Sequence, residues 1–586
     1  MGTGPSAGYA GLRRVIRTLE EEGADFGELR HVRAAEWAVL APAASDDVSS
    51  DRLEDVTIPA SERRLHRESE HTFRVLAAAA VALCQGSDQL GRPLLLRGAG
   101  RADLPSLRGV IRAAEYQRAT GVGAISVASD HTPNGASGHV AAAATALDFA
   151  TDRARCLELI GVPDEGQDRP PLLLGAALEP DGAAAEERLF ARALHPAGTA
   201  VDRLVAVIGY LRLAFKSANW EGAALAADGC LPLTRGLSAG AVARIAGSLT
   251  ASGSQAFELE PETFRHPADI RAFLLKSLGI QATFRELHDD AVRLFRAMRD
   301  TRDPISPELV AQSHLYSALT LVKRRNAVAE AVKEVEQGLA TLPEARGESD
   351  TLRRERGWLH NLRGLTHVVQ RDLLAALRHE KAAWSCLEGL TDASSVHLRV
   401  NLISNISVLQ ERAGKHAQAL RTWEKFAGSG FTDDAKFVKH HSYRAGGLTL
   451  AHGDREEGEA LLRRSLARCD ELADDFHTFE IAAELATLRL DRGDAPRASA
   501  YFDQAATAAG ALGDPYRTAL ARVGGAVAAG RTPAPAVAEL ALRSASNARR
   551  AQDLAKRLRG GGADELRASL PTVRTKLNRP FDLVNY

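Results

Sequence analysis

One loop in the first quarter of the chain carries the residue types that phosphate binding requires. The apolar run 94–96 is followed by Arg97, Gly98, Ala99 and Gly100, and then by a segment with helical character. Glycines at such a strand-to-helix turn let backbone N–H groups surround a phosphate. The loop lacks the Gly-Lys-Ser/Thr ending that holds phosphates and Mg²⁺ in nucleotide hydrolases. We therefore interpret it as a plain turn, with a degenerate nucleotide site as the alternative.

Two other groups contain catalytic residue types at unsuitable spacings. His66 and His71 are five residues apart, so on a helix they point about 140° away from each other and cannot share a zinc ion. Ser129, Asp130 and His131 are adjacent, and adjacent residues cannot form a catalytic triad. We expect an exposed charged helix and a turn at these places. The sequence thus predicts no catalytic residue, no metal site and no cofactor, and a protein that is not an enzyme.

Composition narrows the class of protein. The 586 residues are 45% hydrophobic and 25% charged, and 74 Lys and Arg against 75 Asp and Glu give a net charge of −1. No global field therefore draws the protein to nucleic acid or to an anionic membrane. We expect no signal peptide, because the first residues lack a basic region followed by an apolar run. No apolar run approaches the ~20 residues that span a bilayer, and the five cysteines are widely spaced, as in a reducing compartment. We expect a cytoplasmic protein, and the excess of Arg, Ala and Gly suggests a bacterial origin.

The end of the chain is basic. From residue 541 onward, ten Lys and Arg face four Asp and Glu, and Gly560–Gly562 predicts a joint between two helices. Aromatic residues do not interleave with the basic ones, which argues against nucleic acid and favours a polar cap on a helical array. The last apolar residues, Phe581 to Tyr586, either dock on the preceding helices or serve as a ligand segment for another chain.

The elements that position these residues change along the chain. Apolar strand-like runs at 93–96, 124–127 and 171–174 alternate with alanine-rich helical segments, which indicates a small α/β unit with parallel pairing. Beyond it, almost everything has the pattern of paired helices. The expected domains are N-terminal helices and a linker at 1–61, a small α/β domain at 62–198, helical repeats at 199–530, and a basic C-terminal helical cap and tail at 531–586.

A small residue recurs about every 40 residues through the helical part. An aromatic residue follows four positions later in several copies, as Phe295, Trp423 and Phe502, where it can fill the groove beside the close helix contact. Glycines such as Gly414 and Gly453 supply the turn before the second helix. The recurring small residues are Ala223, Ala291, Ala331, Ala376, Ala419, Gly458 and Ala498.

This series resembles the tetratricopeptide repeat (TPR) family, in its longer-period variants found in MalT-like and kinesin-light-chain-like proteins. Some copies depart from the pattern, since Ser407 and Ala486 replace a small glycine and Arg371 stands where a turn glycine is expected. The resemblance covers about residues 200–530. It implies a mainly α fold, a TPR-like right-handed α-solenoid preceded by the small α/β domain, whose first helices line a concave groove for a peptide or partner segment.

Residues of that groove are carried over from the family by position, about eleven to eighteen residues before each small residue. Asparagines there can bind a peptide backbone from both ends of the side chain, and Tyr443 and Arg444 can supply a stacking surface and an anchor for an anion. A solvated polar helix face explains the same residues without any ligand. The partner-binding residues that the resemblance implies are Trp358, Asn361, Asn401, Ser404, Asn405, His440, Tyr443 and Arg444, with Tyr316, Ser317, Thr320 and Leu362 at matching positions.

The function expected from this sequence is that of a non-enzymatic adaptor or regulator that holds a protein or peptide segment in the repeat groove. A first alternative is a STAND-like regulatory switch that keeps a nucleotide near Gly98–Gly100. A second is an accessory subunit that presents a peptide to a separate biosynthetic enzyme. Arrays of this kind usually bind other molecules and do not transform them.

Overall fold

The architecture is mainly α-helical. The computed structural model describes residues 6–41, 69–99, 102–127, 149–160, 185–251, 264–343, 349–425, 435–544, 547–560 and 562–577. Within these ranges the only sheet has two strands, β1 (Leu94–Leu96) and β2 (Ile125–Val127), which pair in parallel with Leu94 opposite Ile125. The mainly α prediction is confirmed. In the same ranges, no helix combines the length and the apolar character needed to cross a bilayer.

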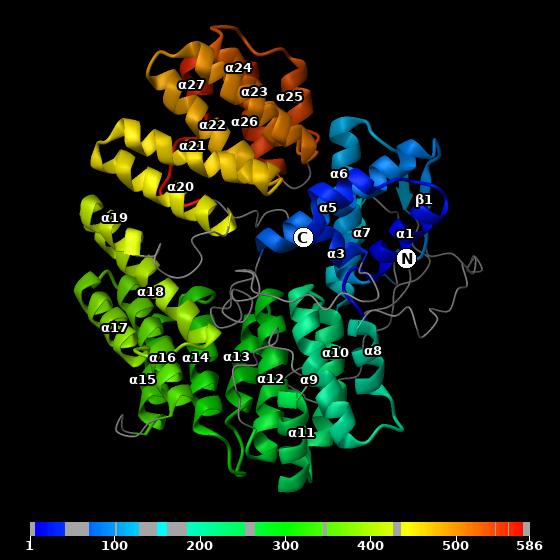
Figure 1. Cartoon of the computed structure of the whole chain (residues 1–586), viewed down its shortest axis with the longest axis vertical. Coiled ribbons are helices and arrows are strands. Elements are labelled where there is room, and N and C mark those ends of the chain that lie inside the picture. Colours follow the sequence, from blue (N-terminus) through cyan, green and yellow to red (C-terminus); the bar gives the residue numbers. More distant parts are fainter. Residues whose placement is uncertain are drawn as a thin grey trace.

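The N-terminal unit comprises α1 to α7 and this small sheet, which lies at its edge with α5 and α6 against β2 (Figure 1). Helix α6 connects the two parallel strands, as a parallel crossover requires. Strands occur where the runs at 93–96 and 124–127 predict them. The helices of the unit are α1 (Ala10–Glu21), α2 (Gly27–Val32), α3 (Ala34–Leu40), α5 (Ser69–Gln89), α6 (Leu104–Thr120) and α7 (Ala150–Ile160).

The array follows as pairs of helices joined by short turns. It begins with α8 (Ala185–Leu194), α9 (Ala200–Lys216), α10 (Trp220–Cys230), the short 3₁₀ helix η5 (Leu231–Thr234) and α11 (Ala239–Ala251). The first helices of the later pairs are α12 (Pro267–Phe284), α14 (Pro307–Lys323), α16 (Asp350–Val369), α18 (Ala393–Arg412), α20 (Ala435–His452), α22 (Asp475–Asp491) and α24 (Pro515–Ala528). Their second helices are α13 (His288–Ala297), α15 (Val328–Thr341), α17 (Leu373–Cys386), α19 (His416–Glu424), α21 (Arg455–Glu471), α23 (Ala495–Ala511) and α25 (Ala536–Ala541).

Each recurring small residue lies on a second helix and is buried. Six alanines of the series are at most 1% exposed, and Gly458 is buried as well. The aromatic residue one turn later fills the contact with the first helix, since a Cβ added at Gly279 would lie 2.4 Å from Phe295 and one added at Gly524 would lie 2.2 Å from Phe502. The packing reason for the repeat pattern is therefore confirmed.

The turns between paired helices use left-handed backbone. Gly414 has φ 72° and Gly453 has φ 113°, a region that glycine reaches without steric cost. Arg371, which stands at the equivalent turn between α16 and α17, adopts φ 64° with a full side chain. The turn is kept there although the glycine is absent, because the helices on both sides fix it.

Helix α6 connects the two ends of the array. Leu104, Leu107 and Ile111 belong to the core shared with α8 to α10, whereas Val110 and Tyr116 belong to a core that includes Phe476 and Leu512 from the last repeats. The N-terminal unit therefore lies between the beginning and the end of the array, as the view in Figure 1 shows. The chain closes on itself.

The C-terminal part covers the end of the array. Helix α26 (Ala548–Gly560) packs against α25, and α27 (Ala563–Arg567) packs against α24. Ala551 and Leu554 join the core of the last repeats, so the basic helix has one buried apolar side. Beyond α27 the chain continues without regular secondary structure through residues 571–577.

Several sequence predictions fall outside the described residues. They are the strand at 171–174, the linker after residue 41, the Ser129–His131 turn, His66, Gly100 and the apolar end Phe581–Tyr586. The five cysteines, all within the described ranges, form no disulfide; four of them are buried and Cys386 is partly buried.

Candidate functional site

The groove residues predicted on α16 lie largely inside the array. Trp358 is 1% exposed, and its indole Nε1 donates to Ser394 Oγ at 3.3 Å. The matching residues on α14 are also core, with Tyr316 stacked on Phe295 at a ring distance of 5.2 Å. In this structure these side chains connect neighbouring repeats and do not form an open surface.

The two central asparagines bind each other. Asn405 Nδ2 donates to Asn361 Oδ1 at 2.9 Å and approaches the carboxyl oxygens of Glu380 at 3.4 and 3.5 Å. Glu380 is 2% exposed, and burial raises its pKa to about 8 although the hydrogen bond from Asn405 opposes the shift. Neighbouring Asn401 is 8% exposed, and Ser404 is partly buried. The asparagines thus satisfy a buried acid.

The residues predicted on α20 do contact a peptide segment, and that segment belongs to the same chain. We call residues 571–577 the strap. Tyr443 is fully buried beneath it, Arg444 is 5% exposed, and both side chains hydrogen-bond to strap residues. His440 precedes Tyr443 on α20, and its ring is edge-on to that of His477, with the ring centres 5.4 Å apart. Of the eight predicted residues, Tyr443 and Arg444 are thus the two that contact the strap directly through hydrogen bonds.

Arg574 is the main side-chain anchor of the strap. Its Nε donates to Glu484 Oε1 at 2.9 Å, and its Nη2 donates to Glu484 Oε1 and Glu480 Oε2, each at 2.6 Å. Glu484 is completely buried and Glu480 is 9% exposed at the side chain, both on α22. A planar guanidinium can reach two carboxylates at once, which a lysine ammonium cannot do with the same geometry.

The strap backbone is also held. Arg574 N donates to Tyr443 Oη at 3.3 Å, and Arg444 Nη1 donates to Thr575 O at 3.1 Å. Thr575 Oγ1 donates to Glu411 Oε1 at 2.7 Å. Gly447 leaves room for the strap, because a Cβ there would lie 2.3 Å from Arg574 O. We call Glu411, Tyr443, Arg444, Gly447, Glu480 and Glu484 the strap site; its residues come from the first helices α18, α20 and α22.

The charges of the strap site favour a cationic ligand. Three carboxylates, Glu411, Glu480 and Glu484, face the guanidinium groups of Arg444 and of Arg517, whose Nε is 3.7 Å from Glu480. Burial raises the pKa of Glu484 to about 7, against the opposing charge of Arg574. Burial and the nearby Glu484 also raise the pKa of Tyr443, so its hydroxyl keeps its proton and donates to Glu484. Arg517 also pairs with Asp514 at 2.6 Å, so Arg574 supplies the nearest positive charge for Glu480 and Glu484.

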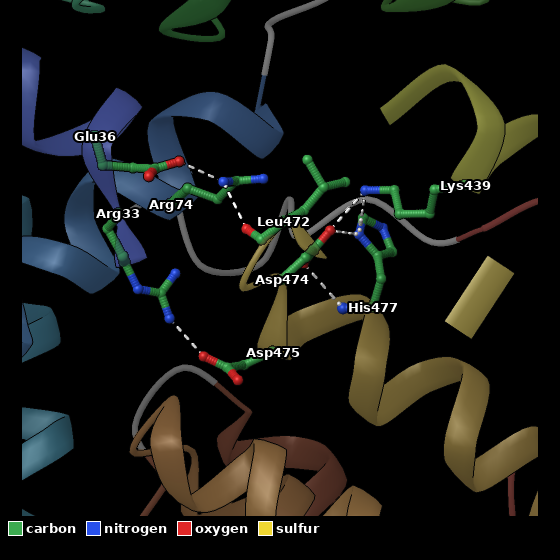
Figure 2. A network of polar contacts seen from close by, with 8 residues as sticks. All are labelled: Arg33, Glu36, Arg74, Lys439, Leu472, Asp474, Asp475 and His477. Atoms are coloured by element: carbon green, nitrogen blue, oxygen red, sulfur yellow. Dashed lines mark hydrogen bonds and ion pairs between the residues drawn. The ribbon is translucent and has the colours of Figure 1, made fainter. Parts of the chain in front are cut away.

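A separate group of polar contacts joins the N-terminal unit to the repeats that also hold the strap (Figure 2). Arg74 Nη2 donates to Leu472 O at 2.8 Å, and Arg33 forms an ion pair with Asp475. Arg112, which is fully buried, donates to Leu512 O. We call Arg33, Arg74 and Arg112 the clasp.

Two arginines of the clasp bind equivalent positions of successive repeats. Leu472 is the C-cap of α21 and Leu512 is the C-cap of α23. The carbonyl groups at a helix C-terminus are unsatisfied and carry partial negative charge, so cations are favoured there. The N-terminal unit therefore recognises the repeat itself, at two adjacent copies.

A buried cluster supports the clasp from the array side. Lys439 Nζ lies 2.6 Å from Asp474 Oδ2, and His477 Nδ1 lies 2.7 Å from the same oxygen. The three side chains are at most 2% exposed, and Asp474 also caps α22 by accepting from His477 N (Figure 2). The cluster orders the start of α22, because the side chain that caps this helix is also held by Lys439. Among the described residues, no three His, Cys, Asp or Glu side chains gather as metal ligands.

The loop after β1 is closed by a carboxylate. Asp103 is the N-cap of α6 and accepts from Ser106 N, and it also accepts from Tyr9 N and Gly11 N of the N-terminal helix. Gly98 has φ 72°, as a tight turn requires. A phosphate at the start of α6 would meet this buried carboxylate, so the turn interpretation agrees with the described part of the loop.

A surface depression between α13, α14 and α15 is lined by arginines that already have partners. It encloses about 680 Å³ and includes Arg293, Arg296 and Arg299. Arg296 and Arg299 both bind Glu334, and Arg293 pairs with Asp290. Although burial opposes the shift, a hydrogen bond from His314 and the charge of Arg299 lower the pKa of Glu334 to about 2. Each of these arginines is therefore already paired with a carboxylate of the array.

Sequence reasoning did not identify Arg574, Glu480 or Glu484 as site residues. Arg574 is one of many basic residues in the tail, and 131 positions separate Thr575 from its partner Arg444. The available signal was the isolated Thr-Val-Arg-Thr-Lys stretch after the last helix together with two glutamates one turn apart on a first helix.

Comparison with known proteins leaves the chain without an assigned family. No known family profile matches it, and no curated protein is similar to it in sequence. Its fold is similar to that of a signal transduction ATPase with numerous domains (STAND) with a tetratricopeptide repeat sensor from Pyrococcus horikoshii, at 12% identity over 92% of this chain and 93% of that one, with a TM-score of 0.40. It is also similar to the Rap conjugation gene regulator of plasmid pLS20 in complex with the Phr* peptide, at 11% identity over 63% of this chain and 96% of that one, with a TM-score of 0.30. At these TM-scores the two similarities do not indicate a function for this chain.

Proposed function

We propose that this protein is a regulator or adaptor that binds an extended peptide or protein segment on the first helices of its array. One observation carries the proposal: a seven-residue segment without regular secondary structure, the strap, already lies on α18, α20 and α22. The contacts include backbone groups of the segment as well as its side chains, which is how extended peptides are recognised.

The charge and shape of the strap site support peptide binding over a purely structural role. Two glutamates on one helix, 9% exposed or less, need a cation to offset their burial. Arg574 of the irregular segment is 2.6 Å from both glutamates, whereas Arg517 of the neighbouring helix α24 is 3.7 Å from Glu480. Because residue 447 is a glycine, no side chain occupies the place where the backbone of the segment passes closest.

The alternative of a nucleotide switch has less support. In the described part of the loop after β1, the N-terminus of α6 is capped by Asp103, whose carboxylate accepts three backbone N–H groups. One of these donors, Ser106 N, lies in the first turn of α6, where a phosphate would need it. A melting temperature that does not change with Mg·ATP or ADP is therefore the expected result.

Selection of peptides from a random library tests the proposal. Wild-type protein and an Arg574→Ala variant, in which the strap no longer holds its anchor, are used as targets. We expect enriched peptides to lose binding when Gly447→Ala is added, because the new Cβ obstructs the peptide backbone. Gly510→Ala is the matched control, since a Cβ at that helical glycine meets nothing within 4 Å. Failure to enrich any peptide, or enriched peptides that bind both glycine variants equally, would refute the proposal.

A further inference from the structure

We propose that the strap is a built-in competitor: the strap site takes an extended segment with an arginine followed by a hydroxyl residue, and the chain's own residues 571–577 occupy it until such a segment from another protein displaces them. This inference rests on the function proposed above. It adds the chemical class of the ligand and the way in which access to the site is controlled.

The ligand class follows from which contacts depend on side chains. Arg574 reaches two carboxylates on α22, and Thr575 donates to Glu411 on α18. Two further hydrogen bonds involve the backbone N–H of residue 574 and the carbonyl of residue 575, which any peptide possesses. The site therefore specifies an arginine and a neighbouring hydroxyl, and tolerates other residues around them.

The strap is attached in a way that suits a displaceable segment. It carries no regular secondary structure, and Thr572 and Lys576 are exposed between its anchored residues. Its apolar contribution is confined to Leu577, which is 6% exposed, and Val573, which packs partly against the core of the last repeats. Few residues of the strap enter the core, so its release leaves the helices of the array in place.

The tether makes the strap an effective competitor. Three residues, 568–570, connect α27 to the strap, and short connections give effective concentrations of order millimolar. A free peptide must compete with that concentration, so its apparent affinity falls by the fraction of molecules whose site is open. Removing the guanidinium of Arg574 takes this cation away from two carboxylates that are at most 9% exposed, and leaving a buried charge without its partner weakens binding by about 30-fold or more.

The strap site is also connected to the N-terminal unit by a series of side-chain contacts. Glu480 lies beside Arg517, whose guanidinium lies 4.6 Å from the ring centre of Phe476. Phe476 packs against Phe73 of α5, with ring centres 5.3 Å apart. A continuous series of contacts therefore joins Glu480 of the strap site to α5 of the N-terminal unit.

The experiment measures binding of a labelled peptide with the sequence of residues 569–577 to the full-length chain by fluorescence anisotropy. Arg574→Ala is expected to bind the peptide about 30-fold or more tightly than wild type does, because its own strap has lost its anchor. A double variant, Arg574→Ala with Gly447→Ala, is expected to lose this binding, and Arg574→Ala with Gly510→Ala is expected to keep it. Peptides with alanine or lysine in place of the arginine should bind much more weakly than the parent peptide.

Hydrogen exchange of the strap provides the second measurement. Backbone amides of residues 571–577 should exchange faster in Arg574→Ala and, without any change of charge, in Gly447→Ala, while Gly510→Ala should match wild type. Arg567→Ala is a further control, because Arg567 is an exposed arginine of the same region that pairs with Asp491.

Two outcomes would overturn the inference. Equal peptide affinity of wild type and Arg574→Ala would mean that the strap does not compete, and unchanged exchange in both release variants would mean that the strap is a fixed part of the fold. If library peptides still bind the Arg574→Ala chain and are blocked by Gly447→Ala, the proposed peptide-binding function survives either outcome. Absence of every such peptide would remove both.

Discussion

Replacing Glu380 by glutamine should make the protein more stable at alkaline pH and leave its stability unchanged in mild acid. Glu380 is 2% exposed on α17, and the hydrogen bond that opposes its raised pKa comes from a neutral amide, that of Asn405. Burial raises its pKa from the ordinary 4.5 to about 8. Glutamine has the same shape and never ionises, so it keeps the packing and removes the titration.

The sign follows from proton binding in the two states. Between pH 4.5 and about 8 the folded protein keeps the proton on Glu380 and the unfolded chain has lost it, so the free energy of unfolding falls as pH rises. The contribution is fully present below pH 4.5 and lost above pH 8. A shift of this size corresponds to at most about 5 kcal/mol. Relaxation of the site makes a few kcal/mol the working expectation at pH 9.

The assay is denaturant unfolding of wild type and Glu380→Gln at several pH values between 4.5 and 9, followed by circular dichroism. The two proteins should agree at pH 4.5 and diverge steadily above it, with the variant more stable. Glu388→Gln, at an exposed position on the following turn, is the matched control and should track wild type throughout. A variant less stable than wild type at pH 9 would refute the reasoning, because it would show that an ionised Glu380 is stabilised by its neighbours.

Three further predictions concern other parts of the chain. Arg371→Gly should raise the urea midpoint of unfolding, by about 1 kcal/mol of stability, because the left-handed backbone at this turn penalises a side chain; an unchanged or lower midpoint contradicts this. Lys439→Met should cost about 3–5 kcal/mol in the same assay by leaving the buried Asp474 carboxylate without its cation, and a loss below 1 kcal/mol would show that the pair contributes little. The ratio of hydrogen-exchange rates between the strap amides and the α20 amides should be larger below pH 7 than above it, because Arg574 needs the ionised form of Glu484, whose pKa is about 7. A ratio that does not change with pH would show that this titration does not govern strap release.

The repeat pattern was predictable because each repeat is a local packing solution. A small residue such as Ala291 must be buried where two helices approach, and an aromatic such as Phe295 must fill the space beside it. Both requirements act within a few dozen residues, so the sequence shows them directly. The short strands after residues 93 and 124 were predictable for the same reason.

Only the helix residues of the candidate site were predictable from the sequence, and the segment that they contact was not. Tyr443 and Arg444 lie on the first helix, as the resemblance implies, and they contact an irregular peptide segment. That the segment is residues 571–577 depends on tertiary contacts far along the chain. Asn361 and Asn405 look like ligand-binding residues in the sequence, but their side chains bind each other, and no local pattern distinguishes the two uses.

The clasp could not be predicted from the sequence. Arg33 and Asp475 are 442 positions apart, and Arg112 and Leu512 are 400 apart. The clasp arginines donate to main-chain carbonyl oxygens at two of the three contacts, and every residue has such a carbonyl. Only the fold brings them together.

The bridging position of α6 sets a limit on how this protein can change over time. An open array of helix pairs gains or loses a copy at little cost, because each unit contacts its neighbours alone. Here the first and the last units both pack on one 17-residue helix, so an added pair would carry the end of the array away from it. Duplication of a repeat, the usual route by which such arrays grow, would detach the N-terminal unit. The number of repeats is therefore fixed by geometry, and new specificity must come from substitutions on α18, α20 and α22 or in the strap.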